Sequence, residues 1–493
     1  MENNKFISLR YSISKTSTSS KQSAVNFAKI APLIFMGVSS LSPNVTYAIT
    51  PTQQAVADYF TSSGLCTSLG GGIGYGGGIG YGGAIADTTP RQVSARGIST
   101  QAFTNGPYDC SNLSSGEGPS LFETGITNML NTGTGVQTNA MLQALAFEEV
   151  ITMGTLNVEV NGAHMNNLAA HVAGLHQGGM GMRYPSLPAN LLADSGKQTG
   201  GAGSSGGSKH GIGFFLNARA DTGEKDATNI ETGFDFDAFG ITGGMDIRLN
   251  NMVVLGLAAG YGNTEADYTS STGSMDMEGY SLSVFGTVYK KDQYYVDGII
   301  NLTRNSFDSS RTFTDPNGTV QTANGETDGN ILSLGLAIGY EHHDKGTTIG
   351  PFAKLNYTRV DIDAFAETGA GPWGLSVSDQ EITSLEGVVG IQVSKAISKP
   401  WGVLIPQLRL ELVHEFDNDS RIINAQFLGA TQNGINAIML QPTDEPDRNY
   451  INLSLSAAAQ FSHGRSAFVQ YTGLLAQEDV SEHALELGVR WNY

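Results

Sequence analysis

From residue 211 to the end, apolar and polar residues alternate along the chain with a period of two. The runs at 332–340, 404–412 and 451–461 show this most clearly, because apolar residues fill nearly every second position. A pattern of this period predicts β-strands with one apolar face. The last run ends the chain and carries its apolar and aromatic side chains at Leu485, Leu487, Val489, Trp491 and Tyr493.

The segments between the strands decide which kind of β-structure is expected. An apolar face would fill the core of a soluble sandwich, whereas in a membrane barrel it would face lipid. The short turns lie near 250–251, 291–292, 343–344, 399–400 and 463–464, and the long polar segments cover 222–237, 263–276, 306–328, 363–380, 417–449 and 476–482. Short turns on one side and long loops on the other are typical of outer-membrane barrels. The sequence therefore favours an all-β transmembrane barrel of about twelve antiparallel strands.

The period changes upstream of these strands. Between residues 138 and 176, apolar residues recur every three or four positions, which predicts helix. Gly178 and Gly179 end the helical pattern, and a Gly/Ser-rich linker at 196–207 separates it from the first strand. We assign residues 137–210 to a helical linker with its spacer and residues 211–493 to the barrel.

The first 48 residues have the organisation of an export signal. Basic residues precede an apolar run at 30–38, and the stretch from Val45 to Ala48 offers small residues for cleavage after Ala48. We therefore expect residues 1–48 to be a signal peptide and the Sec export machinery to be a partner. The alternative is a disordered tail that contains a chance apolar patch.

Residues 49–136 form a short Gly-rich segment in which a hexapeptide occurs twice, at 70–75 and 76–81. This segment contains both cysteines of the chain, Cys66 and Cys110. In an exported protein such a pair is usually a disulfide, which here would close a loop of about 44 residues and stabilise the segment by roughly 4 kcal/mol. Two free thiols are the alternative. The formal net charge of −19 argues against nucleic acid as a partner.

Over residues 137–493 the chain resembles the autotransporter family of type V secretion. The phrases that carry the resemblance are residues 233–240, residues 279–286 and the terminal aromatic strand, together with the helical stretches at 144–150 and 165–168. The resemblance implies a twelve-stranded barrel with a helix through its pore, linked to an exported passenger, here residues 49–136. It also implies that the barrel-assembly machinery recognises the terminal strand.

The same topology would begin the first strand in the periplasm and place the long loops outside the cell. The lumen would then be lined by charged residues that include Asp297, Lys354, Arg409, Glu411 and Arg490. A helix with a polar face fits such an interior, because the lumen of these barrels is polar and can be plugged.

The candidate chemistry is self-cleavage between Asn166 and Asn167. In relatives that release their passengers, an Asn-Asn pair in the pore cuts itself when the first side-chain amide attacks its own carbonyl carbon. Asn166 would be the nucleophile and Asn167 the new N-terminus. The alternative is that both residues belong to the polar face of a plugging helix. His164, His171 and His176 lack the spacing and the carboxylates of a metal site, so we expect neither metal nor cofactor.

Three functions remain open from the sequence. The first is an outer-membrane protein of a Gram-negative bacterium that exports a short passenger to the cell surface for adhesion or host contact, with outer-membrane lipid and a host or cell-surface ligand as partners. The second is a plugged, porin-like channel. The third, an outer-membrane hydrolase, has no catalytic motif in its favour.

Overall fold

The computed structural model describes two long parts of the chain, the second with short gaps, and a few residues upstream of them. Helix α4 covers Glu148–Gln177, and the strands lie within residues 211–492, of which 229, 270–271, 291–292 and 433–437 are not described. Upstream, the structure describes Ala55, Val56, Tyr59, Leu145, β1 (Thr67–Ser68) and β2 (Tyr108–Asp109). The predicted signal peptide, Cys66, Cys110, the Gly/Ser-rich linker and Tyr493 lie outside the described residues.

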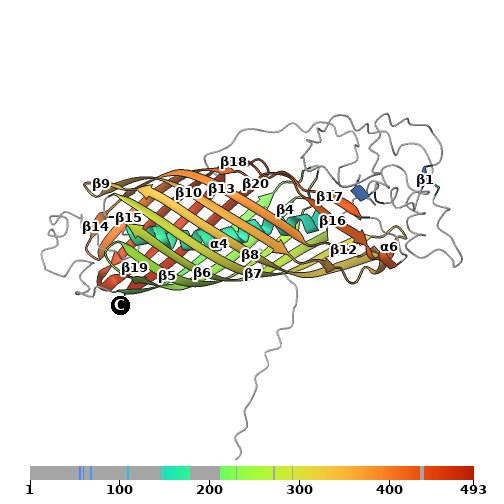
Figure 1. The fold of residues 1–493 in the computed structure, drawn as a ribbon, viewed down its shortest axis with the longest axis horizontal. Coiled ribbons are helices and arrows are strands. Elements are labelled where there is room, and N and C mark those ends of the chain that lie inside the picture. The colour runs from blue at the N-terminus through green and yellow to red at the C-terminus, as the bar shows by residue number, and fades with distance from the viewer. Residues whose placement is uncertain are drawn as a thin grey trace, which may run out of the picture. The chain divides into compact units, whose positions relative to one another are not determined.

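Twelve long antiparallel strands form a closed barrel (Figure 1). They are β3 (Ile212–Lys225), β4 (Phe234–Arg248), β5 (Val253–Tyr268), β6 (Thr272–Tyr289), β7 (Tyr294–Thr314), β8 (Val320–Tyr340), β10 (Thr347–Ile362), β13 (Gln380–Lys395), β15 (Gly402–Glu415), β18 (Asn449–Phe461), β19 (Arg465–Leu475) and β20 (Val480–Asn492). Each strand pairs with the next along the chain, and β20 closes the barrel on β3, from Val480 opposite Lys225 to Asn492 opposite Gly213. The predicted fold class is confirmed.

One end of the barrel has short connections. The small elements β9 (His342–Asp344), β14 (Ile397–Lys399) and η4 (Ser462–Gly464) lie in these turns.

Among the described residues, no helix is both long and apolar enough to cross a bilayer.

The alternation of polarity reverses partway along the strands. In the first part of β7, Leu302 points outward and is 57% exposed, while its neighbour Asn301 is buried inside. Beyond Leu302 the outward residues are polar, beginning with Arg304, and the inward Phe307 is 0% exposed. The outer surface therefore has an apolar band that suits lipid, followed by a polar collar that suits water.

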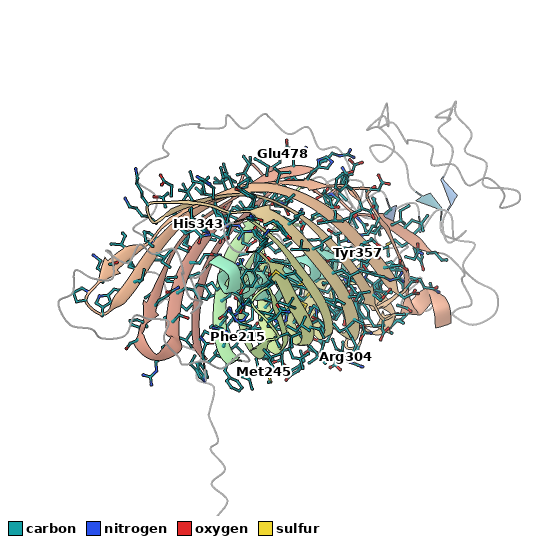
Figure 2. The ribbon with its side chains drawn as sticks, turned by 60° about the vertical axis from the view of Figure 1, so that its left-hand side comes forward. Phe215, Met245, Arg304, His343, Tyr357 and Glu478 are labelled. Carbon is teal, nitrogen blue, oxygen red and sulfur yellow. The ribbon has the colours of Figure 1, made fainter. Side chains whose placement is uncertain are left out.

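Aromatic residues mark the edges of the apolar band. On the collar side they are Phe239, Tyr280 and Tyr357, each followed two residues farther out by a charged residue: Asp237, Glu278 and Arg359. At the other edge, exposed aromatic side chains occur at Tyr294, Tyr340, Trp401 and Trp491. Aromatic girdles at both interfaces are expected of a transmembrane barrel. Figure 2 shows Met245 and Phe215 on neighbouring strands: Met245 is exposed on the outer surface, whereas Phe215 is buried inside.

The prediction of long loops at 263–276 and 306–328 was wrong. Most of these residues extend β5 to β8 beyond the band. They looked like loops because their outward residues are polar, but their inward residues, among them Ala266, Met275 and Phe313, are buried apolar side chains. At the collar the outer face becomes polar and the inner face apolar, but the segments keep the period of two that marks a strand.

Two other predicted loops fold into the collar end of the barrel, which we call the mouth. They form β11 (Phe365–Ala366), η3 (Gly371–Trp373), β12 (Leu375–Val377), β16 (Ile422–Phe427), α6 (Leu428–Gln432) and β17 (Met439–Pro442), which together we call the lid. Its strands make a four-stranded sheet in the order β11-β12-β16-β17. Its buried side chains, including Trp373 and Phe427, pack with the inward residues of the collar in one apolar cluster, the mouth core.

A buried ion pair ties the lid to the barrel. The Nε and Nη2 groups of Arg311 on β7 donate to the two carboxylate oxygens of Glu367, with nitrogen–oxygen distances of 2.7 Å each. Glu367 also accepts a hydrogen bond from the backbone N–H of Leu375 at 2.8 Å. The lid is therefore fixed by charge as well as by apolar packing.

Helix α4 runs inside the barrel (Figure 1). Near its start, Val150, Ile151 and Met153 are buried in the mouth core. Toward its end, Leu168 and Val172 belong to a second apolar cluster, which includes Phe215 on the inner wall. The helix thus extends from the mouth toward the opposite end, and it confirms the helix predicted for residues 138–176 from residue 148 onward.

Candidate functional site

The face of α4 that meets strands β3 to β6 carries three polar side chains, His164, Asn167 and His171, which we call the latch. Their spacings of three and four residues place them on one side of the helix. His164 bridges two strands, with ring nitrogens 2.9 Å from the hydroxyl of Thr242 on β4 and 2.9 Å from that of Ser283 on β6.

A glycine makes room for the His164 ring. Gly260 on β5 lies against this ring, and a Cβ at that position would overlap it. The latch therefore depends on a missing side chain in the wall as well as on the polar groups around it.

Asn167 is fully buried and held at two points. Its amide donates to the Thr242 hydroxyl at 3.4 Å, and its backbone carbonyl accepts a hydrogen bond from Asn217 on β3 at 3.0 Å. The same Asn217 amide lies 3.3 Å from a carboxylate oxygen of Glu486 on β20. Asn167 is thus joined to the seam at which the last strand closes on the first.

His171 forms the third part of the latch. Its ring stacks on Phe215 with centroids 3.6 Å apart, and its Nε2 lies 3.3 Å from a carboxylate oxygen of Asp246. Arg490 donates to the same carboxylate at 2.6 Å. The prediction that Arg490 lines the lumen is confirmed.

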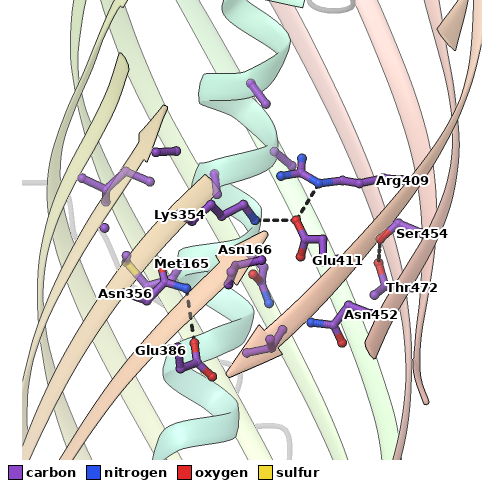
Figure 3. Close-up of a pocket in the computed structure, with 18 of the residues that line it drawn as sticks. Met165, Asn166, Lys354, Asn356, Glu386, Arg409, Glu411, Asn452, Ser454 and Thr472 are labelled. Atoms are coloured by element: carbon purple, nitrogen blue, oxygen red, sulfur yellow. Dashed lines mark hydrogen bonds and ion pairs between the residues drawn. The ribbon is translucent and has the colours of Figure 1, made fainter. Parts of the chain in front are cut away.

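The opposite face of α4 borders a polar cavity of about 230 Å³ (Figure 3). Across the cavity, Lys354 and Arg409 both contact one oxygen of Glu411, at 2.7 and 2.6 Å. These three residues and Asp297 line the lumen, as the sequence predicted. A second carboxylate at the cavity, Glu386, accepts hydrogen bonds from Asn356 at 3.2 Å and from Tyr450.

The structure separates the two residues of the predicted cleavage site. Asn166 is exposed and lines the cavity (Figure 3). Asn167 is buried in the latch. Asn167 therefore has a structural role in the intact chain, and cleavage at this bond stays a prediction. The side chain of His176 lies outside the described residues.

The partners of the latch were missed in the sequence. Thr242, Ser283, Asp246 and Glu486 come from strands far along the chain, and they meet α4 only after the barrel closes. The available signal was the spacing of His164, Asn167 and His171, which resembles that of a packed helix face.

A second group of contacts lies at the mouth, outside the apolar band. Tyr59 packs edge-on against Phe427 of the lid, with ring centroids 5.5 Å apart. Burial raises the pKa of Tyr59 to about 12, although a hydrogen bond with the backbone of Phe427 opposes this shift. Arg421 of the lid lies against Gly154 of α4, where a Cβ would overlap its guanidinium group. Burial lowers the pKa of Arg421, while the nearby charge of Glu231 raises it.

The remaining predicted sites are only partly described. The outward side chains of β20, Leu485, Leu487, Val489 and Trp491, are exposed on the apolar band. In the N-terminal segment β1 pairs with β2, and Thr67 lies opposite Asp109. Among the described residues, no group of three or more His, Cys, Asp and Glu side chains is arranged to hold a metal ion.

Comparison with known proteins gives matches over the barrel. The family model described as "Autotransporter beta-domain" matches residues 214–472. Outer membrane protein B of Rickettsia japonica is 22% identical over 82% of this chain and 24% of its own length. Esterase EstA of Pseudomonas aeruginosa is 22% identical over 46% of this chain and 35% of its own length. The chain thus spans about a quarter to a third of these curated relatives.

Among solved structures, the translocator domain of the autotransporter NalP from Neisseria meningitidis is similar over 57% of this chain and 88% of that domain. The TM-score is 0.46 and the sequence identity is 17%. The β-domain of the Bordetella autotransporter BrkA also matches 57% of this chain, at 15% identity and a TM-score of 0.42.

Proposed function

The chain belongs to the autotransporter β-domain family, and from this premise we propose that its barrel exports residues 49–136 and displays them at the cell surface. The barrel is an outer-membrane autotransporter barrel of the Gram-negative type. The proposed parts are a signal peptide at 1–48, a passenger at 49–136, a pore linker and spacer at 137–210, and the barrel at 211–493.

The path of α4 carries this proposal. The helix enters at the mouth and runs down the lumen, with Val150 and Met153 in the mouth core and Leu168 in the lower cluster. The N-terminal end of α4 therefore lies at the mouth, while β3 begins at the other end of the barrel. A barrel with this threading holds the upstream segment on the side of the mouth.

The collar supports the orientation that places the mouth outside the cell. Polar outward residues such as Arg304 and Asp308 extend the strands beyond the lipid band only at the end that carries the lid. Long extensions and loops on the extracellular side, with short turns in the periplasm, are the usual arrangement in outer-membrane barrels.

The mouth core also supports display over conduction. Apolar side chains of the lid, the collar and α4 fill the interior there, including Trp373, Phe307 and Ile151. A packed apolar layer is a barrier to ions and polar solutes. We therefore favour an exporter that is closed at rest over an open channel.

We propose further that the barrel acts without enzymatic activity of its own. We also propose that the barrel-assembly machinery recognises the terminal strand through Leu485, Leu487, Val489, Trp491 and Tyr493. The esterase activity named for one relative belongs to a protein of which this chain matches 35%. Outer-membrane lipid and export machinery follow as partners from the family, and a host or cell-surface ligand of residues 49–136 belongs to the proposal.

The test is the intact mass of the protein extracted from outer membranes, combined with protease treatment of whole cells. We expect a chain that begins near residue 49 and loses part of residues 60–144 to the external protease. A chain that begins at Asn167 would show cleavage in the pore. Absence from the outer membrane, or full protection of the segment on intact cells, would refute display.

A further inference from the structure

The apolar contacts at the mouth join two parts of the chain that lie on either side of residues 60–144, a segment that contains most of the proposed passenger. Val56 and Tyr59 precede this segment and are 0% and 1% exposed, both within the mouth core. Leu145, Val150 and Ile151 follow it and are buried in the same core. Both ends of the segment therefore terminate in one apolar cluster.

The docked side chains of the N-terminal end lie on one helical face. Ala55, Val56 and Tyr59 are helical, and the spacing of three between Val56 and Tyr59 turns both side chains to the same side. Tyr59 packs against Phe427 of the lid, and Ala55 packs at the edge of the same core. One turn of helix is marginal in water, so its helical state depends on this packing.

We infer that Ala55, Val56 and Tyr59 form a docking element that binds the lid of their own barrel after export, so that residues 60–144 are displayed while anchored to the mouth at both ends. This inference rests on the proposed export of the segment. It differs from the usual picture of a passenger that leaves the barrel as a free N-terminal arm. The occupant of the lid is the chain itself, because Val56 and Tyr59 fill the site on its surface.

Anchoring at both ends would keep the N-terminal product on the barrel after cleavage in the pore. A cut between Asn166 and Asn167 would break the chain below the mouth core but would leave Val56, Tyr59, Leu145 and Val150 in place. The burial of each of these apolar side chains stabilises the association of the N-terminal part with the barrel. The N-terminal product would therefore stay on the barrel and would not be released.

Alkylation of a single cysteine on intact cells measures the docked state. The variant is Val56→Cys in a chain that also carries Cys66→Ser and Cys110→Ser, so that residue 56 holds the single thiol. A membrane-impermeant maleimide reacts with it only when the turn is undocked. We expect slow labelling, and we expect Tyr59→Ala to accelerate it by about tenfold or more, because a buried side chain of this size contributes at least 1.4 kcal/mol. Tyr59→Phe keeps the ring against Phe427 and should label as slowly as the parent.

The control is Ile422→Cys in the same cysteine-free chain, because Ile422 is 63% exposed on the lid. If this residue fails to react, the lid is not on the surface, and it is the proposed function that fails. If Ile422→Cys reacts and Val56→Cys reacts equally fast, the docking element is refuted while surface display stands. Protection of Val56→Cys that persists in Tyr59→Ala also counts against docking on the lid.

Discussion

The contact between Gly260 and His164 gives the sharpest test of how the barrel holds its helix. We consider the variant Gly260→Ala. The new methyl group would overlap the imidazole ring, which would have to leave the hydroxyls of Thr242 and Ser283. Each lost hydrogen bond costs about 0.5–1.5 kcal/mol. The substitution should therefore weaken the binding of α4 to the wall by about 1–3 kcal/mol.

Dissociation of the helix from the barrel reports this loss. A thrombin site placed in the linker at 196–207 is cut in the folded, detergent-solubilised protein, and the N-terminal fragment is then separated from the barrel at increasing urea concentration. With a urea dependence of about 1–3 kcal/mol per molar, the urea midpoint for fragment loss should fall by roughly 1 M in Gly260→Ala. The barrel itself should remain folded over this range.

Two further variants decide whether the contact with His164 is the cause. Gly298→Ala is the matched control, because a Cβ at Gly298 on β7 would meet nothing within 4 Å, and it should leave the midpoint unchanged. In a His164→Ala chain the ring is gone, so Gly260→Ala should add no further loss. Equal effects of the two glycine variants, or full additivity with His164→Ala, would refute the latch.

Three other expectations follow. Arg311→Ala leaves Glu367 buried without its cation, which should destabilise the lid by about 3–5 kcal/mol and make protease cleavage of the lid faster. The double variant that also replaces Glu367 by Ala should recover part of this stability. No recovery in the double variant would speak against the ion pair. We expect a disulfide between Cys66 and Cys110, since the β1–β2 register places their neighbours Thr67 and Asp109 opposite each other. Reduction should then change the gel mobility of the unfolded chain. An unchanged mobility would show free thiols. Because burial raises the pKa of Tyr59 from 10.0 to about 12, docking should be insensitive to pH below about 10 and weaken as the pH rises toward 12. The labelling of Val56→Cys relative to Ile422→Cys measures this, and Tyr59→Phe should abolish the alkaline response.

The barrel was predictable because its strands carry a strict period of two over many residues. Leu334, Leu336 and Ile338 indicate a strand whichever way they point. The period does not show whether the apolar face of a strand lies inside or outside the barrel. At the collar the apolar residues turn inward, as Phe307 and Met277 do, and a polar outer face such as that of Asp276 and Asp308 then looks like loop composition. The extensions of β5 to β8 were missed for this reason.

The charged wall of the cavity was predictable from the sequence, whereas the latch was not. The charged lumen residues Lys354, Arg409 and Glu411 followed from the inward parity of their strands. The latch depended on pairings between residues 50 to 119 positions apart, such as Asn167 with Asn217 and His164 with Ser283. No local motif encodes such pairs, because the closure of the barrel brings the partners together.

Helix α4 contacts the barrel through the apolar mouth core and through the polar latch. For the proposed export, this difference in chemistry predicts the order in which the two contacts form. At the mouth, the lid, the collar and the first turns of the helix share one apolar core, with Ile151 beside the lid. A chain that still moved outward through the mouth would occupy the space that this core fills, so the lid can close only after residues upstream of α4 have passed. Deeper in the barrel, polar partners such as Thr242 and Asp246 hold His164 and His171. Polar groups lining the wall can be hydrated while the chain passes, whereas the mouth core forms only when Val150, Ile151 and Met153 arrive together. For the proposed export we therefore expect helix seating and lid closure to occur together at the end of transport, and the loss of either should leave the other incomplete.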